Sequence, residues 1–166
     1  ASSVYFGLTH NQLIQRAVRV TTKPNDAISL IIPDKDIYYQ IAKNQQLNIL
    51  TTELTPDYEL DINLILEQIK KEDSKVIVFS SPHYPTANQL KEEDVLALAR
   101  ETEVPLIVDE SYVEFGKYSL VNQVQKFDNL TVVRSFSKAW GLGAFSSAFL
   151  VSNAKNIEIL KENYII

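Results

Sequence analysis

Lys138 and Asp109 are the two side chains whose type and position in the sequence most clearly predict chemistry. Asp109 directly follows the apolar run Leu106–Val108, and Lys138 stands in a small-residue turn after the apolar run Leu130–Val133. A third apolar run, Val76–Phe79, leads into polar residues in the same way. Open α/β sheets bind ligands at the carboxyl ends of their strands, so the three segments are predicted to face one site.

A lysine amine and a carboxylate at neighbouring strand ends suit pyridoxal phosphate. The amine of Lys138 would hold the aldehyde of this cofactor as a Schiff base, and Asp109 would keep its ring nitrogen protonated. The ring could then accept the electrons that are left when a substrate Cα–H bond breaks, while the displaced lysine carries the proton. The hydroxyls of Ser135 and Ser137 could hold the phosphate together with backbone amides.

Other chemistries fit these residues less well. Asp109 could instead cap a helix or end a strand in water, with Glu110 as its solvated neighbour. A metal site would need nitrogen ligands, but the two histidines, His10 and His83, are not spaced as metal ligands. The sequence contains no Gly-x-Ser-x-Gly elbow to supply the nucleophile of a Ser-His-Asp triad. Residues 141–146 resemble a dinucleotide-binding fingerprint but lack its third glycine.

The elements that must position these residues alternate between strand and helix along the chain. Asp61 can cap a helix whose apolar residues recur at helical spacing. Short β-branched runs separated by helices predict an α/β fold, a three-layer α/β/α sandwich with a mostly parallel sheet, rather than a helical bundle. The predicted strands are Ala27–Ile32, Leu47–Thr51, Val76–Phe79, Leu106–Val108, Leu130–Val133 and Ala148–Val151, and the predicted helices are Ile37–Asn44, a helix containing Ile62, Ile65, Leu66 and Ile69, Lys91–Glu101, a short one within Ser119–Val124, and Lys155–Tyr164.

The composition limits the classes of function. The formal net charge of −5 argues against a nucleic-acid partner, which needs a basic surface. No apolar run approaches the roughly 18 residues of a membrane span, and the lack of cysteine excludes disulfides and thiolate catalysis. The chain starts at Ala1, contains no methionine and ends in Tyr164-Ile165-Ile166. We therefore expect it to be a piece of a longer polypeptide, with a cytoplasmic location.

Two segments carry a resemblance to a known family. Asp109–Phe115, followed by Asn129–Leu142, resembles the core of the fold-type I pyridoxal-phosphate aminotransferases of class I and II. The resemblance is closest to the histidinol-phosphate aminotransferase branch, with threonine-phosphate decarboxylase nearby. Ser81–Asn88 is similar to the Asn-Pro-Asn-Asn-Pro-Thr-Gly-Asn loop of that family. The resemblance covers nearly the whole chain and implies that residues 1–166 are the cofactor-binding large domain, incomplete and without its small domain.

The resemblance assigns roles to individual residues. It implies that Lys138 is the Schiff-base lysine, that Asp109 is the partner of the pyridine nitrogen, and that Tyr112 bonds the phenolic oxygen of the cofactor. Ser135 and Ser137 would lie beside the phosphate. The Gly-x-Thr phosphate turn near the start of the family's domain is similar to Gly7-Leu8-Thr9, which makes Thr9 a further cofactor-binding residue.

Four positions depart from the family pattern. Tyr84 takes the place of the asparagine that meets the phenolic oxygen, and Ala87 that of a glycine. Lys35 aligns with the aromatic residue that stacks on the cofactor ring, and Ser146 with an arginine that binds the phosphate. Loss of the guanidinium alone would remove a charge-assisted contact of roughly 1.5–3 kcal/mol. Together with the lost stacking ring, it could weaken cofactor affinity by about two or three decades.

The resemblance implies an aminotransferase of amino-acid biosynthesis that moves an amino group between an amino acid, for example a phosphorylated one such as histidinol phosphate, and a 2-oxo acid. It also implies a homodimer, while the charge, the apolar run lengths and the histidine spacing argue against nucleic acid, a membrane and a metal. Two alternatives stay open. One is a catalytically degenerate domain with a structural or dimerisation role. The other is a pyridoxal-phosphate-dependent decarboxylase of a phospho-amino acid, because the absent small domain largely decides the reaction.

Overall fold

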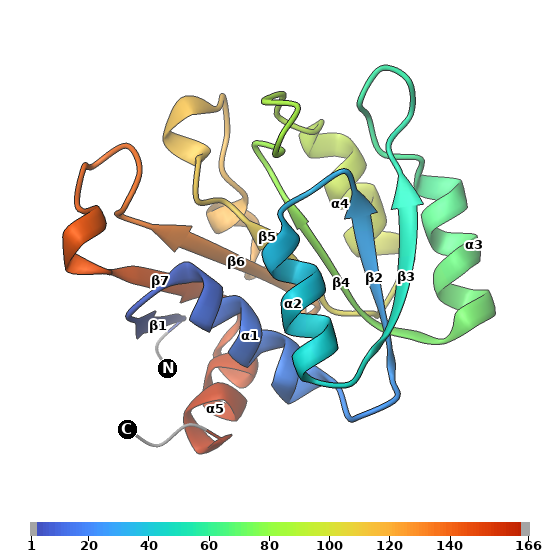
Figure 1. Cartoon of the computed structure of the whole chain (residues 1–166), viewed down its shortest axis with the longest axis horizontal. Coiled ribbons are helices and arrows are strands. Elements are labelled where there is room, and N and C mark those ends of the chain that lie inside the picture. Colours follow the sequence, from blue (N-terminus) through green and yellow to red (C-terminus); the bar gives the residue numbers. More distant parts are fainter. Residues whose placement is uncertain (1–2, 164–166) are drawn as a thin grey trace.

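The protein, described for residues 3–163 by a computed structural model, is built on a seven-stranded sheet with helices on both faces (Figure 1). Short 3-10 turns at Val113–Phe115, Leu120–Gln123 and Gly143–Phe145 lie in the loops. The strands are β1 Val4–Gly7, β2 Ala27–Ile32, β3 Asn48–Glu53, β4 Ser74–Ser80, β5 Leu106–Asp109, β6 Leu130–Ser135 and β7 Ala148–Val151, and the helices are α1 His10–Thr21, α2 Asp36–Asn44, α3 Ile62–Glu72, α4 Glu92–Glu101 and α5 Ala154–Asn163.

The strands lie in the order β1-β7-β6-β5-β4-β2-β3. All pairings from β3 to β6 are parallel, whereas β7 runs antiparallel to both β6 and β1. The central strands are buried on both sides, which explains why their sequences are continuous apolar runs without alternation. The expected α/β class and the mostly parallel sheet are confirmed.

The two faces of the sheet carry separate hydrophobic cores. On one face, α1, α2 and α5 pack over side chains such as Val78, Ile107 and Val133. On the other face, α3 and α4 pack over Phe79 and Val108. Successive residues of one strand thus serve opposite cores, as the pleat of a β-strand requires. In Figure 1, α1 and α2 lie in front of the twisted sheet, and the two cores on its opposite faces make the expected three-layer sandwich.

Local signals explain where two of the helices begin. The Asp61 carboxylate accepts a hydrogen bond of 3.0 Å from the backbone N–H of Leu64 and caps α3, as predicted. The Thr9 hydroxyl caps α1 in the same way, with a bond of 3.1 Å from the N–H of Gln12. Gly7 precedes this cap because a Cβ at that position would approach the Leu13 side chain to 2.6 Å.

The sequence-based assignment missed the beginning of the chain and some element boundaries. Neither β1 nor α1 was predicted, because β1 is only four residues long and α1 has a mixed, polar-rich sequence. Strand β4 extends beyond the predicted Val76–Phe79 at both ends, and β3 begins one residue later and ends two residues later than expected. The helix expected within Ser119–Val124 is a 3-10 turn. Tyr164, the predicted end of the last helix, lies outside the described residues.

Candidate active site at the carboxyl ends of β4, β5 and β6

Three parallel strands bring the predicted site segments to one edge of the sheet. Ser80 at the end of β4 pairs in register with Asp109 at the end of β5, and Asp109 pairs with Val133 of β6. The ladder continues beyond these pairs, since the N–H of Ser81 donates to the Asp109 carbonyl and the N–H of Glu110 donates to the Val133 carbonyl. The segments that contain Asp109 and Lys138 therefore leave neighbouring strands at the same edge, as the sequence predicted.

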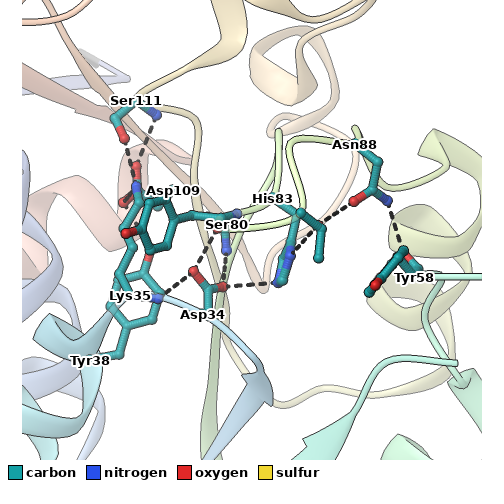
Figure 2. Close-up of polar contacts among 11 residues, drawn as sticks. Asp34, Lys35, Tyr38, Tyr58, Ser80, His83, Asn88, Asp109 and Ser111 are labelled. Carbon is teal, nitrogen blue, oxygen red and sulfur yellow. Dashed lines mark hydrogen bonds and ion pairs between the residues drawn. The ribbon is translucent and has the colours of Figure 1, made fainter. Parts of the chain in front are cut away.

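Asp109 is completely buried, and three donors surround its carboxylate (Figure 2). The Lys35 ammonium lies 2.7 Å from Oδ2, and the Tyr38 hydroxyl donates to the same oxygen over 2.8 Å. The backbone N–H of Ser111 donates to Oδ1 over 2.9 Å. The alternative interpretation of Asp109 as a water-exposed strand end is therefore wrong. A buried carboxylate with these partners is held as an anion.

The electrostatics of the site agree with an ionised Asp109. Burial by itself would raise the pKa of Asp109, but the charges of Lys35 and His10 and the hydrogen bonds from Lys35 and Ser111 outweigh it, so the pKa is lowered. Burial, and then the negative charge of Asp109, raise the pKa of Tyr38 well above its usual value. The Tyr38 phenol is thus a neutral donor to the carboxylate.

His10, the first residue of α1, faces the same charges. Burial lowers the pKa of His10; the negative charge of Asp109 opposes this shift, and the positive charges of Lys35 and Lys138 add to it. The imidazole is therefore predominantly neutral at pH 7. The sequence reasoning considered His10 only as a metal ligand and missed its place beside the two lysines and Asp109.

Lys138 lies over the ring of Tyr112. Its Nζ is 5.4 Å from the ring centroid, and the Lys35 Nζ is 5.0 Å from the same centroid. Both distances are in the range of cation–π attraction. Among the described residues, no hydrogen-bond or ion-pair partner is recorded for the Lys138 ammonium, and the residue is exposed. Lys138 thus presents an accessible amine beside a phenol, and Lys35 links that phenol to Asp109.

The predicted phosphate residues occupy the turns next to Lys138 and at the start of α1. Ser135 ends β6 with its side chain buried, and its Oγ accepts a 3.0 Å bond from the N–H of Ser137. Ser137 is half-buried and directly precedes Lys138. Thr9 caps α1 and directly precedes His10, whose pKa responds to the charge of Lys138. These contacts agree with one group of residues around the lysine.

Tyr84 is not brought into this group. Its side chain is 48 % exposed, and among the described residues no polar or ring contact joins it to Lys138, Asp109 or Tyr112. Its backbone N–H donates to Ser80 Oγ over 3.0 Å. Ala87, in the same loop, has a left-handed backbone with φ of 62°. Glycine adopts that conformation without strain, which explains why the family pattern has glycine there.

The loop that contains Tyr84 is fixed by a network outside the predicted site (Figure 2). Asp34, after β2, accepts bonds of 2.8 Å from the N–H and 2.7 Å from the Oγ of Ser80. The buried ring of His83 lies with Nε2 3.4 Å from Asp34 Oδ2 and Nδ1 2.9 Å from Thr86 Oγ1. This network ties the ends of β2 and β4 together. Asp34 was not singled out from the sequence.

Lys35 was named from the sequence as a departure from the family pattern, but its contact with Asp109 was not predicted. It follows β2, which neighbours β4 in the sheet, so its position past a buried strand was the available signal. The Lys35 side chain is 13 % exposed and reaches a partner 74 residues away in sequence. That pairing depends on the strand order, which local sequence patterns do not define.

A large cavity lies at the opposite end of the sheet from these residues. Its volume is about 610 Å³, and it is bounded by α1, the end of α4, the loop before β6, and α5, with Val20, Arg100, Asp128 and Ile159 among its lining residues. None of the predicted site residues lines it. Within residues 3–163, no helix has the length and apolar character to cross a bilayer, and no three acidic, histidine or cysteine side chains gather as metal ligands would.

The residues present fit the expected cofactor in kind. An accessible amine, a buried ionised carboxylate, a phenol and two serine hydroxyls surround one sheet edge, as pyridoxal phosphate requires. Besides the asparagine whose place Tyr84 takes, two further contacts that the family pattern supplies are replaced. Lys35 provides an ammonium instead of a stacking ring, and Ser146 is an exposed residue with a left-handed backbone, φ 40°, instead of an arginine.

The chain is similar to known proteins over nearly its whole length. Residues 1–163 match the family described as aminotransferase class I and II. The chain is 29 % identical over 160 residues to the histidinol-phosphate aminotransferase of Clostridium novyi. The alignment covers 96 % of this chain and 45 % of that protein. The chain thus spans about half the length of the relatives that it matches.

Solved structures show the same fold. The histidinol-phosphate aminotransferase of Sinorhizobium meliloti, in complex with pyridoxal-5'-phosphate, superimposes with a TM-score of 0.90 at 18 % identity, over 98 % of this chain and 45 % of that one. A decarboxylase from Sulfurospirillum multivorans superimposes with a TM-score of 0.83 at 21 % identity, over 98 % of this chain and 48 % of that one. Since proteins with different reactions share the fold, the fold does not identify the reaction.

Proposed function

Because the chain belongs to the class I and II aminotransferase family, we propose that it is the cofactor-binding domain of a pyridoxal-phosphate-dependent aminotransferase. The enzyme would move an amino group between an amino acid and a 2-oxo acid. The observation that carries the proposal is the meeting of Lys138 and Asp109 at one sheet edge, on either side of Tyr112 and Lys35. A structural module would have no need of this combination.

The proposed roles follow from the chemistry of each side chain. When bound, the cofactor supplies a ring that accepts the electron pair of a breaking substrate bond. Lys138 Nζ would hold the cofactor and, once released, would accept and return the substrate proton. The Asp109 carboxylate, kept ionised by its donors, would stabilise a positive charge on the ring nitrogen. Tyr112 would donate from its hydroxyl to the phenolic oxygen of the cofactor.

The phosphate of the cofactor would lie between the turn after β6 and the start of α1. Ser135 and Ser137 would offer hydroxyls, and the N-terminal end of α1, after Thr9, would offer unpaired backbone N–H groups and the positive end of its dipole. The Lys138 backbone stands in the first of these turns. With Ser146 in place of an arginine, this site would bind phosphate more weakly than a site with a guanidinium.

Histidinol phosphate is the substrate that we propose, on the basis of the relatives' names, and a homodimer is the proposed assembly. The degenerate-domain alternative is favoured by one observation, the ion pair between Lys35 and Asp109. The decarboxylase of a phospho-amino acid has no such support within this chain. Release of CO₂ rather than formation of a 2-oxo acid would identify a decarboxylase.

The proposal is tested with the purified chain and pyridoxal phosphate. We expect an absorbance band distinct from that of the free cofactor, and borohydride treatment should leave the mass of the reduced cofactor on the peptide that contains Lys138. The Lys138→Ala variant should show neither. Lys155→Ala, a lysine on α5, is the matched control and should behave like the parent chain. Labelling that is equal in the parent and in Lys138→Ala would refute the proposal.

A further inference from the structure

Lys35 is anchored so that its ammonium reaches Asp109. Its backbone N–H donates to Asp34 Oδ1 over 2.7 Å, and Asp34 is in turn held by Ser80 at the end of β4. At the other end of the side chain, Nζ donates to Asp109 Oδ2 over 2.7 Å and to Ser111 Oγ over 2.8 Å. The side chain is thus fixed at both ends in a largely buried position, which distinguishes it from a surface lysine that contacts an acid in passing.

The acceptor capacity of Asp109 is largely used by this arrangement. Each carboxylate oxygen can accept about two hydrogen bonds. Oδ2 accepts from Lys35 and Tyr38, and Oδ1 accepts from the Ser111 N–H. A protonated ring nitrogen that approached this carboxylate would therefore have to share it with an ammonium or to displace that ammonium.

The charge balance leads to the same result. Lys35 supplies a full positive charge against the single negative charge of Asp109. Beside Lys35, His10 adds little positive charge at neutral pH, because burial lowers the pKa of this histidine, the charge of Asp109 opposes that shift, and the two lysines add to it. A carboxylate that is already neutralised has little remaining attraction for a second cation.

We infer that Lys35 is a built-in counter-ion of Asp109 that competes with the ring nitrogen of the cofactor, and that it thereby determines how tightly and in which ionic form this chain binds pyridoxal phosphate. The inference rests on the proposed function. It makes Lys35 a positioning residue that acts through Asp109. Removal of the competing charge is expected to strengthen cofactor binding, whereas loss of a supporting contact would weaken it.

The test measures dissociation constants for two probes: pyridoxal phosphate, and its analogue in which carbon replaces the ring nitrogen. The parent chain should bind both with similar affinity. Lys35→Met, a neutral side chain of similar length, should bind pyridoxal phosphate at least about tenfold more tightly than the parent, which corresponds to about 1.4 kcal/mol. It should also prefer pyridoxal phosphate to the analogue. Lys35→Arg keeps the positive charge and should behave like the parent.

Two further variants keep the test decisive. Lys35→Phe supplies a ring as well as removing the charge, and should bind at least as tightly as Lys35→Met. The double variant Lys35→Met/Asp109→Asn should lose the preference for pyridoxal phosphate over the analogue. Without cofactor, Lys35→Met should lower the thermal unfolding midpoint in the parent but much less in the Asp109→Asn background, because the ion pair is absent there.

The outcomes separate this inference from the proposed function. If borohydride labels Lys138 in the parent, but the neutral variants at position 35 bind pyridoxal phosphate no more tightly, the counter-ion role is wrong and the proposed function stands. If only the neutral variants bind and become labelled, Lys35 is confirmed as the competitor, and the parent is the degenerate form. If neither the parent nor any folded variant binds the cofactor, both fail.

Discussion

At the scale of single residues, Asp109 is the group on which the site depends. Its carboxylate is buried and accepts hydrogen bonds from three donors, two of them from the segment that begins α2, so its ionisation is coupled to the folded state. Lys138 differs from it, because its ammonium is exposed and its recorded contact is the face of Tyr112. The acid of the site is therefore preorganised, whereas the amine is free to react.

The ionisation of Asp109 predicts a pH dependence of stability. Because folding lowers the pKa of Asp109, its contribution is complete above the unfolded pKa near 4 and is lost as the pH falls through the lower folded pKa. Asp109→Asn should therefore be less stable than the parent by about 1.5–3 kcal/mol at pH 7. Urea unfolding between pH 7 and pH 2.5 should show this difference shrinking below about pH 4. A difference that stays constant over that range would contradict the lowered pKa.

The hydroxyl of Tyr38, a residue of α2, donates a hydrogen bond to the Asp109 carboxylate. Tyr38→Phe removes a buried donor to a charged acceptor and should destabilise the chain by about 1.5–3 kcal/mol, measured by urea unfolding. Tyr39→Phe is the matched control on the same helix, since among the described residues no hydrogen bond is recorded for the Tyr39 hydroxyl. Equal losses of stability in the two variants would mean that the bond to Asp109 contributes little.

At the scale of elements, the site depends on the junction of β2 and β4 as much as on the strands that carry Asp109 and Lys138. Asp34 extends β2 toward the end of β4, and the next residue along the chain is Lys35. The Asn88 amide binds the Tyr58 carbonyl over 2.8 Å and holds the far end of the 81–88 loop. The loop that resembles the family motif is therefore fixed by contacts outside that motif.

Asp34→Ala should test this junction. It leaves the Ser80 N–H and Oγ and the Lys35 N–H without their acceptor, and should cost about 2–4 kcal/mol of unfolding free energy. Asp36→Ala makes the same chemical change at an exposed position in the first turn of α2, where only the helix dipole is affected, at about 0.3–1 kcal/mol. A similar cost for the two variants, measured by urea unfolding, would exclude the structural role of Asp34.

At the scale of the whole molecule, aromatic side chains gather at the edge of the sheet formed by β1 and β7. Phe6 contacts Phe149, with ring centroids 6.2 Å apart, and Phe149 contacts Phe136 at 5.3 Å. Phe136 in turn meets Trp140 at 6.4 Å. Phe6 and Trp140 are at least 60 % exposed. Exposed apolar groups that are linked in this way are typical of an association surface.

We expect the chain to self-associate as a homodimer through this aromatic surface and through Phe145, which lies in the same loop between β6 and β7 as Phe136 and Trp140 and is 78 % exposed. Phe145→Glu should shift the protein toward monomer in sedimentation velocity experiments. Leu64→Glu, on α3 at the other end of the sheet (Figure 1), should not change the association. A parent chain that is monomeric at high micromolar concentration, or equal behaviour of the two variants, would argue against this surface.

The sequence by itself determined the class of the fold and the positions of Asp109 and Lys138. Both result from local signals, because buried parallel strands read as short apolar runs and polar residues follow where those runs end. The same reasoning could not find β1 and α1, since a four-residue edge strand and a polar helix leave weak local patterns.

Only the tertiary structure decided which groups meet at Asp109. The Lys35 ammonium and the Tyr38 hydroxyl reach it from more than 70 residues away in sequence. They can do so because only one strand, β4, separates β5 from β2, the strand that leads into Lys35 and α2. Strand order is a non-local property that arises from the packing of helices on both faces, and no local pattern in the sequence encodes it. The sequence therefore indicated Asp109 and Lys138 as candidate site residues, whereas it did not indicate which groups contact the Asp109 carboxylate.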